Sequence, residues 1–129
     1  MILLDTQVLV WARIDERKLS KSARSSIRRQ SLQGDLGISA FTLYELASMI
    51  ERGKISLNGS IDATLHQFIE GISIRPITEE IAAVAIQFPS DFPRDPGDRL
   101  IAATARVESL PLITADERIQ ACSLLRTIW

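Results

Sequence analysis

Short apolar segments alternate along the chain with longer segments whose apolar residues recur at helical spacing, and this alternation constrains the fold more than any other feature. The predicted strands are residues 2–4, 36–39, 72–77, 112–114 and 125–129. The predicted helices are residues 8–14, 22–32, 40–52, 60–70, 95–109 and 116–123, with one more that begins after Thr78. Strands alternating with helices predict an α/β fold of three layers, with a mainly parallel central sheet between helices.

Local signals support the ends of these helices. Gly53 is a C-terminal cap for the helix before it, and Asp95 followed by Pro96 provides an N-cap and a favoured first helical residue. Three of the five prolines lie in residues 88–97, which must therefore be a loop. A chain of 129 residues has the size of one domain, so we expect residues 1–129 to form a single domain.

Four carboxylates fall where an apolar stretch ends or a helix begins: Asp5, Glu45, Asp98 and Asp116. In a parallel sheet these places converge on one rim, so acids far apart in sequence can share a pocket. Like charges in a shared site repel one another, and a bound divalent cation is the usual way to offset the repulsion. The pattern therefore predicts a metal site.

Two of these acids also have ordinary structural explanations. Asp5 fits the N-cap of the helix that follows it. Glu45 fits a capping box that begins at Thr42, in which it would reach back to the helix start. If Ser39 is the true cap, Glu45 instead lies nearly two turns into the helix, with its side chain directed back toward the strand end.

The other two acids lie beside residues that could take the capping role. Asp95 suits the N-cap of its helix, which leaves Asp98 free for another purpose. Thr114 and Glu117 have capping-box spacing, and that arrangement would leave Asp116 free. Any one acid can be explained by capping, but four at converging ends predict a shared site.

The kind of ligand indicates the kind of metal. Carboxylates suit Mg²⁺ or Mn²⁺, whereas zinc favours His or Cys. The only histidine, His66, and the only cysteine, Cys122, lie away from the acids in sequence. Carboxylate-held Mg²⁺ typically acts on phosphates, activating a water and stabilising the leaving oxygen. Hydroxyls of Thr6 and Thr114 are placed to orient that water.

Basic residues are concentrated near the start of the chain. Residues 13–29 contain seven basic and two acidic side chains. One interpretation is a solvated helix surface, and the other is a face that contacts phosphates beside the acidic pocket. In the second case the RNA-binding candidates are Arg17, Lys18, Lys21, Arg24 and Arg28.

The expected location is the cytoplasm, with no membrane association. A single cysteine excludes an intramolecular disulfide and suits a reducing compartment. The first apolar run is interrupted by Asp5, unlike a secretory leader, and the longest apolar run is far too short to span a bilayer.

Four segments together resemble the PIN-domain ribonucleases, and among them the VapC toxins of bacterial toxin–antitoxin pairs. The segments are LLDTQVLVWA (residues 3–12), ISAFTLYELASMIERGKI (38–55), RDPGDRLIAATA (94–105) and LPLITADERI (110–119). Each segment carries one of the four acids, and their order and spacing extend the resemblance along the whole chain. The chain departs from close relatives at Gln7, Pro93 and Gly97, none of which is an acid of the quartet.

The resemblance implies a PIN-like fold and Mg²⁺- or Mn²⁺-dependent endonucleolytic cleavage of RNA. It implies that Asp5, Glu45, Asp98 and Asp116 are the catalytic, metal-holding acids. It implies supporting hydroxyls at Thr6 and Thr114. We add Asp95 and Arg99 as further supporting candidates. The implied partners are an RNA substrate and a VapB-like antitoxin whose tail covers the pocket, and a homodimer is expected.

Two non-catalytic alternatives have different requirements. A receiver-like regulatory module needs a phosphoacceptor Asp and a late Lys, but Ser39 ends the second strand and no Lys follows the strand at 112–114. A co-repressor that acts only through an antitoxin complex would not need all four acids. No phosphate-binding loop of the G-x-x-x-x-G-K-[ST] type occurs.

Overall fold

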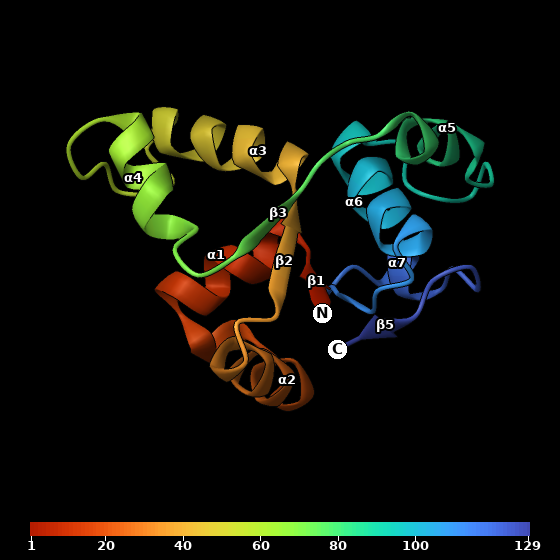
Figure 1. Ribbon diagram of the computed structural model, residues 1–129, viewed down its shortest axis with the longest axis horizontal. Coiled ribbons are helices and arrows are strands. Elements are labelled where there is room, and N and C mark those ends of the chain that lie inside the picture. Colours follow the sequence, from red (N-terminus) through yellow and green to blue (C-terminus); the bar gives the residue numbers. More distant parts are fainter.

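A single five-stranded sheet, in the order β3-β2-β1-β4-β5, runs through the computed structural model, which describes residues 1–129 (Figure 1). The strands are β1 (Ile2–Leu4), β2 (Leu36–Ser39), β3 (Ser73–Arg75), β4 (Leu112–Ile113) and β5 (Thr127–Ile128). Every pair of neighbours is parallel, which confirms the predicted α/β class and makes the sheet wholly parallel. β3 lies at one edge, as its alternating pattern predicted.

The helices are α1 (Thr6–Ile14), α2 (Lys21–Leu32), α3 (Ala40–Glu51), α4 (Ile61–Phe68), α5 (Glu79–Gln87), α6 (Pro96–Val107) and α7 (Glu117–Gln120). Their order agrees with the sequence pattern, and the loop before α6 is where the prolines predicted it. A short 3-10 helix, Glu16–Lys18, was not predicted. α7 is shorter than the predicted helix at 116–123, and β5 is shorter than the predicted strand at 125–129.

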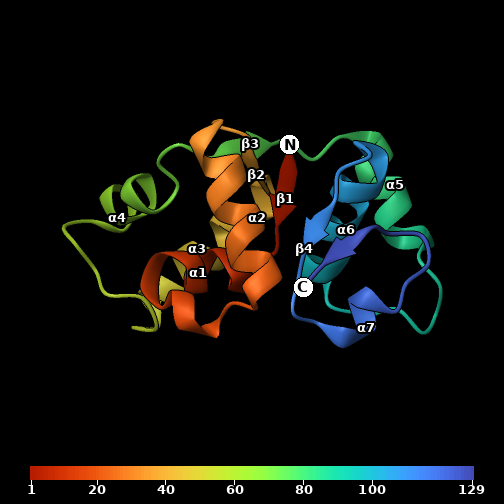
Figure 2. The same cartoon turned by 90° about the horizontal axis from the view of Figure 1, so that it is seen from below.

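The sheet separates two apolar cores (Figure 2). Ile2 and Leu4 of β1 point into a core shared with α1, α2 and α3, against which α4 also packs. Leu3 points the other way, into a core built by α5, α6 and α7. Successive side chains of β1 therefore point into opposite cores, because side chains alternate between the two faces of a strand.

Three helices begin within a few residues of the carboxyl ends of central strands: α1 after β1, α3 after β2 and α7 after β4. α6 reaches the same rim through residues 88–95 and contacts α3 there. The segments that carry the four acids are thus brought to one rim of the sheet. None of the helices combines the length and the apolar character that a membrane crossing requires.

Candidate active site

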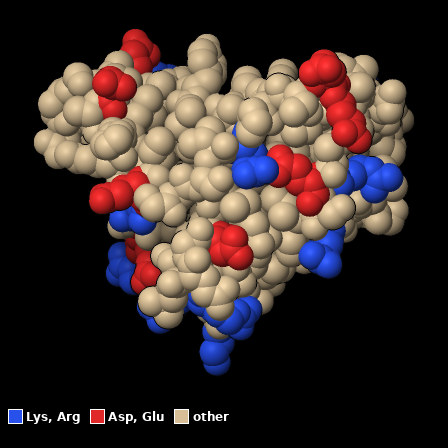
Figure 3. Space-filling view, in the orientation of Figure 1, with Lys and Arg blue, Asp and Glu red and all other residues tan.

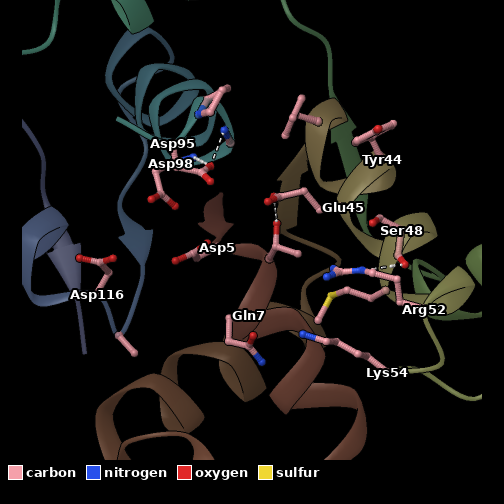
Figure 4. Close-up of a pocket in the computed structure, with 16 residues that line it drawn as sticks. Asp5, Gln7, Tyr44, Glu45, Ser48, Arg52, Lys54, Asp95, Asp98 and Asp116 are labelled. Carbon is pink, nitrogen blue, oxygen red and sulfur yellow. Dashed lines mark hydrogen bonds between the residues drawn. The ribbon is translucent and has the colours of Figure 1, made fainter. Parts of the chain in front are cut away.

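A pocket of about 660 Å³ opens at this rim, and all four predicted acids line it. Asp95 contributes a fifth carboxylate, and Figure 4 shows the acidic side chains directed toward one space from β1, α3, α6 and the turn after β4. The expectation that distant acids meet at the carboxyl ends of the strands therefore agrees with the geometry.

Asp5 occupies the N-cap position of α1, but its side chain does not cap the helix. Its Oδ2 instead accepts a hydrogen bond from Thr114 Oγ1 at 2.8 Å. Thr114 directly follows β4 and is fully buried. Its hydroxyl holds Oδ2 of Asp5 in place and leaves Oδ1 free. The capping explanation for Asp5 is wrong, because a long-range partner takes the carboxylate.

Glu45 lies in the second turn of α3, because Ser39, and not Thr42, is the cap of this helix. Its Oε1 accepts a hydrogen bond from Thr6 Oγ1 at 2.6 Å. Since Thr6 has one hydroxyl proton, the buried Thr42, 2.9 Å away, must donate its own proton to Thr6. The hydroxyls of Thr42 and Thr6 therefore fix the orientation of the Glu45 carboxylate.

Asp95 caps α6 as predicted, accepting hydrogen bonds from the backbone N–H groups of Gly97 and Asp98 at 2.8 and 3.2 Å. Pro96 follows as the first helical residue. The Asp98 side chain makes no hydrogen bond or ion pair with the rest of the protein. One acid of the pair thus builds the helix start and the other is presented to the pocket.

The start of α7 is capped differently from the sequence prediction. Asp116 is itself the N-cap of α7, and its Oδ1 accepts hydrogen bonds from the backbone N–H groups of Arg118 and Ile119 at 2.8 and 3.1 Å. The predicted capping box of Thr114 and Glu117 is therefore wrong. Thr114 faces Asp5 instead, while accepting a bond from the Asp116 backbone N–H. Only Oδ2 of Asp116 remains uncommitted.

Burial and neighbouring negative charges raise the pKa values of three of the acids, Asp5, Glu45 and Asp98. Burial, and then the charges of Asp5, Asp95, Asp116 and Glu45, raise the pKa of Asp98 from 3.8 to about 7. Burial is also the main cause of the raised pKa of Asp5 and of Glu45, and hydrogen bonds from the two threonines only partly oppose it. The protein has thus assembled negative charges that disfavour each other in the absence of a cation.

This donor set fits a hard divalent cation held in part through water. No three acidic, histidine or cysteine side chains are close enough to coordinate one ion together directly. Mg²⁺ usually keeps several waters and is bound by only one or two carboxylates, so a spread arrangement of oxygens suits it. None of the five carboxylates that line the pocket forms an ion pair with a basic side chain, so their charge is open to such an ion.

Arg99 contacts the loop before α6 rather than the pocket. Its guanidinium donates hydrogen bonds to the carbonyl oxygens of Pro93 (2.9 Å) and Ala85 (3.0 Å), and lies 5.8 Å from the centre of the Phe92 ring. Arg99 therefore ties the loop to α5 beside the start of the helix that presents Asp98, and its supporting role stays a prediction.

Gly97 was noted in the sequence only as a departure from relatives. A Cβ at this residue would lie 2.8 Å from Glu45 Oε2 and 3.0 Å from Asp95 Oδ1. Glycine therefore lets the Glu45 carboxylate approach the start of α6 closely. This contact joins α3 to α6, and no local pattern in the sequence indicates it.

The basic residues of positions 13–29 lie elsewhere. Figure 3 shows Lys and Arg side chains gathered over the tip of the molecule formed by α2, and none of the five RNA-binding candidates lines the acidic pocket. Arg17 and Arg28 form ion pairs with Asp15 and Glu16. Lys18, Lys21 and Arg24 make no ion pair, so a role for this face in RNA binding stays a prediction.

Sequence reasoning missed four other residues that line the pocket: Phe41, Tyr44, Arg52 and Lys54. Phe41 lies three residues before Tyr44 and four before Glu45 on α3, and Arg52, the C-cap residue, lies seven residues after Glu45, so all four share one helix face. That spacing was a usable signal. It was overlooked because the two cations are isolated in sequence, whereas the cluster at 13–29 is dense.

Known proteins share both the sequence pattern and the fold. The PIN domain family matches residues 2–123. Ribonuclease VapC22 from Mycobacterium tuberculosis is 35% identical over 130 residues, covering 99% of this chain and 98% of the relative. The crystal structure of FitAcB from Neisseria gonorrhoeae has a TM-score of 0.71 at 26% identity, covering 98% of this chain and 96% of that one. A DNA-bound VapBC from Salmonella typhimurium has a TM-score of 0.75 at 20% identity, with 98% and 97% coverage.

Proposed function

Because the chain belongs to the PIN-domain family, we propose that it is a VapC-type ribonuclease toxin that cleaves RNA endonucleolytically at the acidic pocket. The observation that carries this proposal is the meeting of Asp5, Glu45, Asp98 and Asp116 in one pocket. In this proposal residues 1–129 form one nuclease unit that acts in the cytoplasm. RNA phosphodiester bonds are the substrate.

The four acids would hold Mg²⁺ or Mn²⁺. When bound, such an ion supplies an activated water and stabilises the leaving oxygen of a phosphodiester. The protein itself contributes orientation. Thr114 fixes one oxygen of Asp5, and the Thr42–Thr6 hydroxyl pair fixes Glu45. Asp95 builds the helix start from which Asp98 is presented.

A VapB-like antitoxin is the proposed protein partner. A toxin–antitoxin complex from Klebsiella pneumoniae shares the fold of this chain, as do FitAcB and VapBC. The acidic pocket is suited to a basic side chain from an antitoxin tail, which would occupy the place of the cation. A homodimer is part of the same proposal.

The direct test is RNA cleavage by the purified chain with Mg²⁺ or Mn²⁺. EDTA should abolish cleavage. Asp5→Asn and Asp98→Asn should each reduce kcat at least about 100-fold, because even residues that only orient metal ligands are worth 10–100-fold. Asp62→Asn, which changes an exposed acid on α4 outside the pocket, is the matched control.

Two results would contradict the proposal. If Asp5→Asn and Asp98→Asn cut RNA as well as the parent, the site is wrong. If the parent cuts no RNA under any of these conditions, a non-catalytic role, such as action through an antitoxin complex, becomes the better explanation.

A further inference from the structure

The wall of the pocket that faces the acids is basic. Arg52 and Lys54 line the same cavity as Asp5 and Asp98, and Figure 4 shows both side chains on the side opposite Asp116. Neither cation forms an ion pair with any carboxylate. One N–H of Arg52 donates to the Ser48 carbonyl at 3.3 Å, which leaves the rest of the guanidinium free.

The turn after α3 holds these two cations in place. The backbone N–H of Lys54 bonds to the Met49 carbonyl at 2.8 Å, and that of Gly53 bonds to the Ile50 carbonyl at 3.1 Å. This pair of bonds is a Schellman motif, and Gly53 has the positive φ of 77° that the motif requires. Ile55, directly after Lys54, is buried in the core. The basic wall therefore has a fixed backbone.

An aromatic ring completes this side of the pocket. The Tyr44 side chain is 71% exposed although it is large and partly apolar. It packs against Phe41, with ring centroids 5.8 Å apart, and both rings line the pocket. A large exposed aromatic beside two unpaired cations is a common arrangement for binding single-stranded nucleic acid, because bases stack on the ring while the cations contact the backbone.

We propose that this wall is the subsite for the RNA strand beside the bond that is cut. Arg52 and Lys54 bind a neighbouring phosphate, and Tyr44 stacks with a base. The inference rests on the proposed ribonuclease function and assigns to it specific residues that select and align a single strand. It places the protein's nearest contacts with the RNA backbone on α3 and its C-terminal turn instead of on α2.

Geometry favours a nucleic acid strand over an acidic protein segment as the occupant. Glu45 and Arg52 are seven residues apart on α3, which is about 10 Å along the helix axis. A strand with one phosphate at the acids thus brings a later phosphate to the basic wall. RNA entering among five carboxylates is repelled by them, and unpaired cations in the same cavity offset that repulsion. An acidic peptide could contact the two cations, but it carries no positively charged group to contact the carboxylates on the other side of the pocket.

Binding is the first test. Fluorescence anisotropy with a labelled single-stranded oligouridylate would compare the parent, Arg52→Gln with Lys54→Gln, and Arg126→Gln. Arg126 is an exposed cation outside the pocket and makes no ion pair. The double variant should bind about tenfold or more weakly. Its plot of log affinity against log salt should be less steep by about 0.7 for each phosphate that the wall no longer binds. Arg126→Gln should match the parent.

Tyr44 is tested by a pair of variants. Tyr44→Ala should weaken RNA binding about tenfold without changing the salt dependence, because stacking on an aromatic ring carries no charge. Tyr44→Phe should bind as the parent does, since the ring is retained. In cleavage assays the changes should appear in KM, with kcat nearly unchanged.

The outcomes separate this inference from the proposed function. If Asp98→Asn abolishes cleavage but the double variant keeps the parent's affinity, KM and salt dependence, the enzyme is a ribonuclease and the subsite is wrong. If the double variant loses affinity for an oligoglutamate peptide but not for RNA, the wall binds an acidic protein segment and the inference is also overturned. If the parent cleaves no RNA, the proposed function fails, while the anisotropy comparison still decides whether the wall binds RNA.

Discussion

At the scale of single residues, the acids that line the pocket also destabilise the folded protein when no cation is bound. The Asp98 side chain has no hydrogen-bonding partner, and burial, followed by the charges of four other carboxylates, raises its pKa to about 7. In the unfolded chain the same group ionises near its ordinary value of 3.8. Between these two pH values the folded protein holds a proton that the unfolded chain has released.

The sign of the resulting pH dependence follows from this difference. In EDTA, the contribution of Asp98 to the free energy of unfolding should fall as the pH rises from about 4 to about 7 and then level off. Asp98→Asn removes the charge and should raise Tm by a few degrees at pH 8, but hardly at pH 4, since 1 kcal/mol shifts Tm by about 2–8 °C in domains of this size range.

Thermal melts of parent, Asp98→Asn and Asp62→Asn at both pH values measure this effect. The Asp62 variant should show no such pH-dependent gain. A Tm for Asp98→Asn that drops at pH 8 would mean that the carboxylate stabilises the native state, contrary to the repulsion described.

The candidate site was predictable from sequence where each residue is set by its own segment. Asp5 and Asp98 could be placed because strand ends and helix caps are local signals. The prediction that Thr114 and Glu117 cap α7 was wrong, because the Thr114 hydroxyl donates to Asp5 instead and Asp116 takes the capping role. The hydrogen bond between Thr114 and Asp5 spans 109 residues of sequence, so no local pattern indicates it. The close approach of Gly97 to Glu45 was unpredictable for the same reason, since it joins two helices.

At the scale of elements, two helix starts were predicted correctly because their caps involve neighbouring residues: Thr78 and Asp95 each cap the helix that follows through their own side chains. For α3 the sequence left two alternatives, and the structure has Ser39 as the cap. The short elements α7 and β5 were overestimated in length. Their ends have no strong local signal, and their extent is set by packing against the rest of the sheet.

The turn after α3 allows a matched test of one element's role. Gly53→Ala and Gly34→Ala both place a Cβ in the left-handed region, with φ values of 77° and 66°, and neither Cβ would meet any atom within 4 Å. Each should cost about 1–2 kcal/mol of stability. Only Gly53→Ala should also weaken RNA binding, because only that turn positions Lys54.

Chemical denaturation and anisotropy measure the two effects separately. Equal losses of RNA affinity in both variants would show that general destabilisation, and not the position of Lys54, explains the change. An unchanged affinity in Gly53→Ala would show that the Schellman turn does not position the cation for binding.

At the scale of the whole molecule, a bound ion should tie the two halves together. The acids come from elements on both sides of the sheet: α3 packs into one core and α6 into the other. A cation between them should therefore stabilise the entire fold, by about 2.7 kcal/mol at a hundredfold excess over its Kd.

Melting curves with Mg²⁺ or Mn²⁺ against EDTA test this stabilisation. Asp98→Asn should lose most of the rise in Tm, while Asp62→Asn should keep it. A parent curve that does not respond to millimolar Mg²⁺ and Mn²⁺ would exclude tight coordination at the pocket.

The parallel pairing of β1 with β4 has a consequence for how the protein is made. Asp5 leaves the ribosome 109 residues before its partner Thr114. The pocket therefore cannot be completed, and cannot carry out the proposed cleavage, until Thr114 has been synthesised and β4 has paired with β1.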